Sequence, residues 1–92
     1  MAKTPNSIGI IETKGFSPLI CAADTAVKAA SVEIIEWRQV GSGFVSLVIE
    51  GEVAAVRSAV DAALSAASKV GEITASSVIP RPVEELSTTF DK

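Results

Sequence analysis

The residues that could carry out chemistry are few in this chain. It contains no histidine and no tyrosine, so the commonest general acid-base group and the commonest metal ligand are both missing. Its one cysteine, Cys21, has no imidazole to activate it, and a thiolate nucleophile is therefore not expected. We expect Cys21 to be a small apolar side chain packed on a helix.

The carboxylates offer no clear acid-base pair. Glu33 and Glu36 share a predicted strand but are expected on its opposite faces, and Glu12 stands at a strand end near Lys14. The remaining pair, at 84–85, lies in a polar tail. We interpret all of them as surface charges or subunit contacts.

No phosphate-binding motif is present. The sequence has neither a GxGxxG stretch nor a P-loop, and the Gly-Ser-Gly stretch at 41–43 is too short for either and joins two predicted strands. Together with the missing histidine, this predicts that the chain is not an enzyme and that it has neither cofactor nor metal site.

Charge and hydropathy exclude further classes. The net charge of −3 argues against a nucleic-acid binder, and no apolar run approaches the roughly 18 residues that span a membrane. The N-terminal residues lack the apolar core of a signal peptide, and a single cysteine suits a reducing compartment. We therefore expect a soluble cytoplasmic protein that binds neither nucleic acid nor membrane.

The apolar content is high for a short chain. Of the 92 residues 48% are apolar, and the mean hydropathy is +0.42. A domain of this size buries only about 60% of the surface of its unfolded chain. Part of the apolar surface is therefore expected in subunit contacts.

Periodicity and turn residues predict six elements. Strands are predicted at 7–13, 31–40, 44–50 and 72–79 from their β-branched content, with the Gly-Ser-Gly turn joining the second strand to the third. One helix is predicted to begin at Ser17-Pro18, with Ser17 as its N-cap, and to run to about Ala30. The other is predicted to open at Gly51-Glu52 and to close at Gly71.

The apolar spacing also predicts which faces are buried. In the second strand, Ile35 and Trp37 are expected on one face, with Val32 and Ile34 on the other. The helices should bury residues at 3.6-residue spacing. These are Leu19, Ile20, Ala23, Val27 and Ala30 in the first helix, and Val53, Val56, Val60, Ala63 and Ala67 in the second.

The order of elements is β-α-β-β-α-β, which predicts an α+β, ferredoxin-like fold: a four-stranded antiparallel sheet with both helices on one face. We expect a single domain over 7–82 and a polar C-terminal tail over 83–92, with one helical turn near 83–86.

Eight short motifs occur along the chain between about 7 and 82. They are GIIETKG at 9–15, AAD at 22–24, VKAA at 27–30, VE at 32–33, VGSG at 40–43, GEVAAV at 51–56, VGE at 70–72 and VIPRP at 78–82. Each motif is short, but in this order and at this spacing the set resembles the hexamer-forming bacterial microcompartment (BMC-domain) shell proteins.

The resemblance implies a structural function. Six copies would form a flat homo-hexamer, and hexamers would tile with neighbouring hexamers and other shell proteins around encapsulated enzymes. Gly41, Ser42 and Gly43 would line a narrow central pore for small polar metabolites, with Gln39 near its rim. Lys28 and Arg81 would lie at the edge between hexamers.

Three positions depart from the family pattern. Gln39 stands where many members carry a lysine, which makes the expected pore less positive. Glu50 stands where an arginine is frequent, and Val83 where a histidine is common. These differences bear on cargo and partner choice rather than on the fold.

Two other functions compete with the shell protein. One is a small ligand-binding regulatory module with a ferredoxin-like fold, forming a dimer or trimer, and the other is a minor enzyme such as an acyl-phosphate hydrolase. The enzyme needs an anion cradle with a positioned arginine or asparagine, for which the chain has few candidates. Mass in solution separates the regulatory module from the hexamer.

Overall fold

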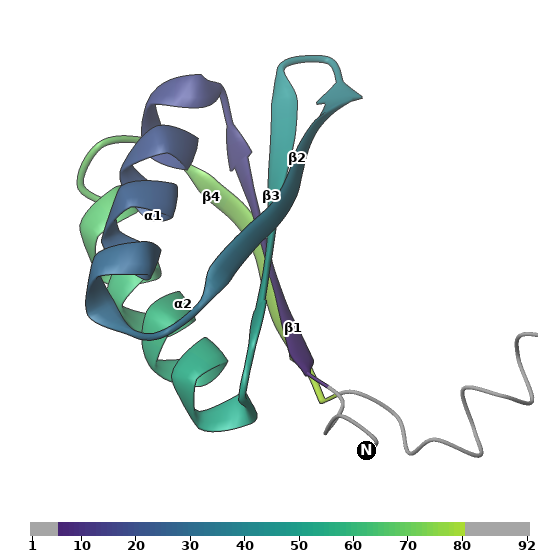
Figure 1. Cartoon of the computed structure of the whole chain (residues 1–92). Helices are drawn as coiled ribbons and strands as arrows, with labels where there is room; N and C mark the ends of the chain where they lie inside the picture. Colours follow the sequence, from purple (N-terminus) through teal and green to yellow (C-terminus); the bar gives the residue numbers. More distant parts are fainter. Residues whose placement is uncertain (1–5, 81–92) are drawn as a thin grey trace, which may run out of the picture.

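A computed structural model describes residues 6–80 of the chain. Four strands and two helices follow one another as β1 (Ser7–Lys14), α1 (Phe16–Ala29), β2 (Glu33–Gly41), β3 (Phe44–Gly51), α2 (Val53–Ala67) and β4 (Ile73–Ile79). Figure 1 shows the two helices packed side by side on one face of the sheet. The predicted element order is therefore confirmed, with strand ends that differ by one or two residues.

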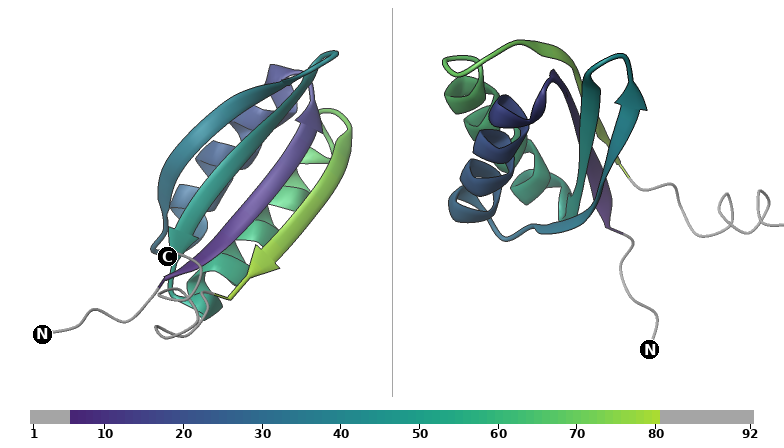
Figure 2. Two further views of the ribbon diagram at one scale, coloured as in Figure 1. Left: turned by 90° about the vertical axis from the view of Figure 1, so that its right-hand side faces the viewer. Right: turned by 90° about the horizontal axis from the view of Figure 1, so that it is seen from above.

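The four strands form one antiparallel sheet in the order β2-β3-β1-β4. In the left view of Figure 2 the sheet lies in front of both helices, and within residues 6–80 no helix or strand covers the sheet face turned toward the viewer. This is the ferredoxin-like arrangement that the sequence predicts. It leaves β2 and β4 as the two edges of the sheet, with α1 on the β2 side.

The core lies between the sheet and the helices. The central strands contribute buried Ile11, Val45, Leu47 and Ile49, and alanines on both helices allow close helix packing. Gly9 lies beneath α2, where a Cβ atom would come within 2.9 Å of methyl groups of Val56 and Val60. The missing side chain at this position lets α2 pack directly on β1.

The first helix begins earlier and is rotated relative to the prediction. Gly15, with φ of 86°, is the N-cap residue, and Ser17 lies inside the first turn without a side-chain capping bond. The predicted serine cap is therefore wrong. The buried face holds Leu19, Ala22 and Ala26, whereas Ile20 and Val27 are exposed.

A β-bulge in β2 changes the predicted faces of that strand. Ile34 pairs with Ile49 and Trp37 pairs with Leu47, and the register shifts between Ile34 and Glu36. The bulge adds one residue, so Ile34 and Trp37 share the face toward the helices. Strict alternation, which placed Trp37 with Ile35 and apart from Ile34, is wrong here.

The second helix ends before the predicted glycine cap. It stops at Ala67 with Ser68 as its C-cap, and Gly71 lies beyond it in the connection to β4. Its buried stripe is Val56, Ala59, Val60, Ala63 and Ala67. Val53, expected in that stripe, is exposed. The helical turn predicted at 83–86 lies outside the described residues.

Candidate functional site

The Gly41–Gly43 turn projects from the tip of the β2–β3 hairpin. All three residues have left-handed backbone conformations, with φ of 117° at Gly41, 55° at Ser42 and 84° at Gly43. Within residues 6–80, Ser42 is the one non-glycine residue with a positive φ. Glycine adopts a positive φ without strain, so Gly41 and Gly43 are suited to the conformation of this turn. Ser42, between them, is exposed to solvent.

Gln39 lies two residues before the turn. It pairs with Val45 across the hairpin, and its side chain is exposed. Together with Gly15, Phe16 and Phe44 it lines a small hollow of about 240 Å³ beside the turn. The neutral amide of Gln39 therefore lies near the turn, at a position where a lysine would carry a positive charge.

The junction between β1 and α1 contacts the turn directly. The Gly15 N–H donates a hydrogen bond to the Gly43 carbonyl oxygen at 2.8 Å, and the Thr13 hydroxyl donates to the Gly15 carbonyl oxygen at 2.9 Å. Thr13 is fully buried. Residue type and spacing alone give Thr13 and Gly15 no role, although both lie within the GIIETKG motif at 9–15.

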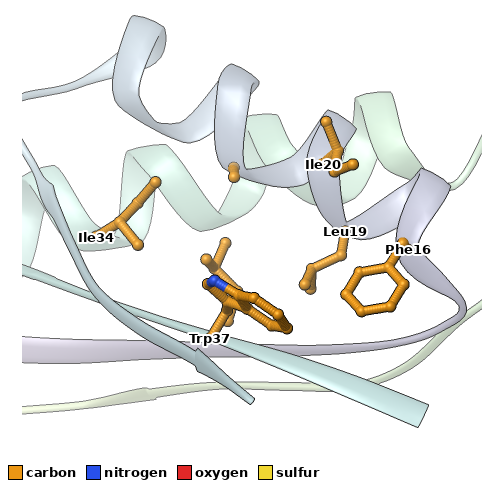
Figure 3. A pocket seen from close by; sticks show the side chains of 7 residues that line it. Phe16, Leu19, Ile20, Ile34 and Trp37 are labelled. Carbon is orange, nitrogen blue, oxygen red and sulfur yellow. The ribbon is translucent and has the colours of Figure 1, made fainter. Parts of the chain in front are cut away.

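An apolar groove runs between α1 and β2. Figure 3 shows Phe16 and Ile20 from the helix opposite Ile34 and Trp37 from the strand. The groove has a volume of about 300 Å³, and Leu19, Ala23 and Leu47 complete its lining. The rings of Phe16 and Trp37 meet edge to face, with centroids 5.4 Å apart. Trp37 is 57% exposed and Ile20 is 65% exposed, so the described part of the chain, residues 6–80, leaves this groove open.

A second, different surface lies at the other edge of the sheet, between α2 and β4. Its hollow has a volume of about 460 Å³ and is lined by three apolar and four small polar residues. The apolar residues are Leu64, Ile73 and Ala75, and the polar residues are Ser65, Ser68, Thr74 and Ser76. Two further apolar side chains of this region of the sequence are exposed: Val70, in the connection between α2 and β4, and Ile79, at the end of β4. We call the α1–β2 hollow the groove and the α2–β4 hollow the β4 surface.

Lys28 lies in the last turn of α1, on the outside of the subunit. Its Nζ is 3.2 Å from a carboxylate oxygen of Asp24, and the two side chains are 74% and 60% exposed. A cation at this end of a helix interacts favourably with the helix dipole. Arg81, the other residue expected at an edge, lies outside the described residues.

The remaining polar side chains do not form a reaction centre. Glu33 and Glu36 pair with Glu50 and Val48, which lie two residues apart in β3, so both carboxylates project from the same sheet face rather than from opposite faces. Glu36 forms an ion pair with Arg38 at 2.8 Å. Within 6–80, no three acidic or cysteine side chains are grouped as metal ligands would be.

Two other sequence expectations concern the helices. Cys21 is partly buried and packs against the core from α1, which agrees with its interpretation as an apolar side chain. Over residues 6–80, neither helix combines the length and hydropathy that crossing a lipid bilayer needs.

Comparison with known proteins identifies the family. The family model described as BMC domain matches residues 7–82. The bacterial microcompartment shell protein PduA of Citrobacter freundii is 42% identical over 86 residues, which cover 94% of this chain and 92% of that protein. The shell protein EutM of Escherichia coli strain K12 is 42% identical over 84 residues, covering 91% and 87% respectively.

A solved structure agrees with both. A microcompartment protein from Desulfitobacterium hafniense DCB superimposes with a TM-score of 0.79 at 36% identity, and the match covers 96% of this chain and half of that one. The two named relatives are shell proteins rather than enzymes, in agreement with the absence of a reaction centre predicted from the sequence. The chain therefore belongs to the BMC-domain family of bacterial microcompartment shell proteins, as its sequence motifs predicted.

Proposed function

We propose that the chain serves the shell as a homo-hexameric ring that tiles with other rings and carries a narrow pore at its centre. The family membership supports a structural role in the shell. The proposal adds three features to this structural role: the number of subunits, the pore and the tiling.

The observation that carries the ring is the presence of two unlike open surfaces at the two edges of one sheet. The groove lies along α1 and β2, and the β4 surface lies along α2 and β4. A subunit that joins its copies through two different surfaces makes a head-to-tail contact, which closes into a ring when the rotation per subunit allows it. Six copies is the number that the family resemblance implies.

The lining of the groove favours a protein neighbour over a small ligand. Its volume of about 300 Å³ is at the lower end of the range for ligand pockets. Such pockets carry several polar groups that orient the ligand, whereas the indole nitrogen of Trp37 is the one polar side-chain atom among the lining residues. Exposed aromatic and aliphatic side chains are typical of the buried centre of a subunit contact.

Phe16 connects the groove to the pore. It lines the groove and also the hollow beside the Gly41–Gly43 turn. A neighbouring subunit seated in the groove therefore comes close to the turn, and the same happens at each of six contacts. Repetition about one axis would produce a ring of turns, each with an exposed Ser42.

Such a ring would select small polar molecules. Each turn would contribute one hydroxyl and exposed backbone polar groups, which interact with polar or anionic solutes better than with bulky apolar ones. The Gln39 amide near the rim is neutral, so selection would depend on hydrogen bonding and size more than on positive charge.

The edge between rings would involve Lys28 and Arg81. Lys28 is highly exposed at the end of α1, and small alanines flank it at 29 and 30, so another ring can approach closely. Arg81 stands between two prolines, which restrict the backbone on both sides. The proposed partners are neighbouring hexamers, other shell proteins and the encapsulated enzymes.

The test is the mass of the purified protein in solution, measured by light scattering or sedimentation. A hexamer of 9.5 kDa chains has a mass of about 57 kDa, and the preparation should also form sheets or tubes at low salt in electron micrographs. A monomer, dimer or trimer at micromolar concentration contradicts the ring.

A further inference from the structure

We propose that the β1–α1 junction sets the conformation of the Gly41–Gly43 turn, and that Thr13 and Phe16 are positioning residues for the pore which that turn would line. The inference rests on the proposed function for the pore, but the contacts that carry it lie within one subunit. We call Thr13, Gly15 and Phe16 the brace.

The first contact of the brace holds the β3 side of the turn. The β1–β3 ladder ends at the pair Lys14 and Phe44, and the bond from Gly15 N–H to the Gly43 carbonyl lies one step beyond it. The last residue of the turn is therefore tied to the central strand β1 as well as to its own hairpin.

Thr13 holds the residue that makes this bond. Its buried hydroxyl donates to the Gly15 carbonyl at 2.9 Å, while the N–H on the other side of Gly15 donates to Gly43. The peptide groups on both sides of Gly15 are therefore held by hydrogen bonds. This matters because the φ of Gly15 is 86°, and glycine has more backbone freedom than any other residue in that region. The hydroxyl of Thr13 compensates for the freedom of the glycine.

Phe16 holds the other side of the turn. Its ring meets Trp37 of β2 edge to face at an interplanar angle of 79°, four residues before Gly41. Aromatic pairs of this geometry attract each other beyond what the area they bury contributes. One short junction therefore contacts both strands from which the turn projects.

A pore needs such restraint. Three consecutive residues with positive φ, two of them glycine, can exchange among several backbone conformations. Six turns that exchanged freely would define no fixed opening. A turn held from both sides keeps one conformation, and the opening then has a fixed size.

The test compares Thr13→Val with Thr13→Ser by amide hydrogen exchange. Valine has nearly the shape of threonine but cannot donate a hydrogen bond, whereas serine keeps the hydroxyl. In Thr13→Val we expect exchange of the Gly15 amide, which donates to the Gly43 carbonyl oxygen, to accelerate about tenfold, the effect of losing one hydrogen bond. Exchange in the middle of β1, for example at Ile11, should be unchanged, and Thr13→Ser should stay within about twofold of the natural protein.

Two results overturn the brace: unaltered exchange at the Gly15 amide in Thr13→Val, or equal acceleration of this amide in both variants. If Thr13→Val does not fold, the natural protein gives the answer. A scalar coupling across the hydrogen bond between Gly15 nitrogen and the Gly43 carbonyl carbon should be measurable by NMR, and its absence from folded protein rejects the brace.

A second comparison addresses the pore itself. Shells assembled from Thr13→Val should admit solutes larger than those the natural shells exclude, and shells of Thr13→Ser should keep the original limit. Faster exchange with an unchanged limit rejects the role in the pore while leaving the contact intact. The mass of each variant is measured separately, so failure of the ring is distinguished from failure of the brace.

Discussion

Lys28 and Asp24 form an ion pair along the exposed side of α1, with the ammonium nitrogen 3.2 Å from a carboxylate oxygen one helical turn earlier. Pairs of this spacing stabilise a helix by only about 0.2–0.5 kcal/mol, because both side chains remain hydrated. The pair therefore contributes little to the fold. Its larger consequence is that the charge of Lys28 is compensated at the place where rings are proposed to meet.

Replacing Lys28 with alanine should leave rings intact and abolish their tiling. The side chain makes no contact with the core, so the mass in solution should stay at that of the natural protein. The edge would lose the Lys28 ammonium group, both as a cation and as a hydrogen-bond donor, while Arg81 would remain. Electron microscopy measures the sheets, and Lys69→Ala, which removes an equal charge just after α2, is the matched control. Sheets of normal size from Lys28→Ala would contradict the placement of Lys28 at the edge between rings.

Asp24→Asn should make tiling dependent on salt. A twofold axis between identical rings brings an edge residue close to its own copy where the axis passes near that residue, and the proposed edge, with Lys28 at such an axis, would set two ammonium groups facing each other. Without the carboxylate their repulsion is uncompensated at low ionic strength and is screened near 1 M salt, where the Debye length is about 3 Å. We expect few sheets at low salt and recovery at high salt, followed by turbidity and microscopy. Asp24→Glu keeps the charge and should tile normally, and equal tiling of Asp24→Asn at low salt contradicts the arrangement.

Ile20→Glu should dissociate the ring without unfolding the subunit. Ile20 is 65% exposed in the single subunit, so a glutamate there changes its stability by only about 0.5 kcal/mol. In the ring the same carboxylate would be buried without a partner, at a cost of at least about 3 kcal/mol, and the affinity between subunits should fall more than 100-fold. Trp37, the single tryptophan, lines the same groove and reports the change, because its emission should shift to longer wavelength when the ring opens.

Val53→Glu is the control for this experiment. Val53 is also an exposed apolar residue, but it lines neither the groove nor the β4 surface. It should keep the mass and emission of the natural protein. A normal mass for Ile20→Glu would mean that the groove is not a subunit contact.

The sequence predicted the order of elements because each element has a clear period or boundary. The β-branched runs, the two alanine-rich helices and the Gly-Ser-Gly turn leave little ambiguity about which segments are strands and which are helices. The antiparallel hairpin and the helices on one face follow from that order. The family motifs predicted the same fold independently.

The faces were harder to predict, for two physical reasons. Ile20 and Val27 continue the apolar stripe of α1, but hydropathy does not distinguish a side chain buried in the fold from one left exposed in the single subunit. In β2, the bulge between Ile34 and Glu36 moves Trp37 to the face of Ile34, and an alternating pattern gives no signal of an extra residue.

The brace was not predictable from residue types. Thr13 and Phe16 lie some 30 residues before the turn in sequence, and only the antiparallel β1–β3 pairing brings them to it. The signal available in the sequence is a glycine, Gly15, directly after a β-branched run, which is typical of a strand end and does not indicate a contact with the turn.

Ser42→Leu should slow the passage of small solutes through assembled shells. Six leucines at the proposed axis would fill the opening and remove its polar groups, because each copy adds a branched side chain at the same ring position. Ser42 already has a left-handed backbone, and leucine adopts it at a similar cost, so we expect stability to change by less than about 1 kcal/mol. Ser42→Gly is the control and should admit solutes at least as fast. Equal flux through intact Ser42→Leu shells would mean that solutes cross elsewhere.

Gly9→Ala should destabilise the fold itself, because α2 packs directly on this residue. An added Cβ would lie 2.9 Å from Val56 Cγ1 and from Val60 Cγ2, and 3.0 Å from Ile49 Cγ1. All three are buried β-branched side chains with little freedom to move aside. Overpacking of this kind costs about 1–3 kcal/mol, which chemical denaturation would measure as a lower midpoint with an unchanged slope.

Val60→Ala in the Gly9→Ala background tests that this loss comes from crowding. Val60→Ala alone is destabilising, because it leaves a cavity under α2. In the double variant the new methyl group at position 9 occupies part of the space that the valine vacated. The loss of stability in the double variant should therefore be smaller than the sum of the losses in the two single variants, by about 1 kcal/mol. Strictly additive losses would show that Gly9→Ala acts through the backbone of β1 and not through its contact with α2.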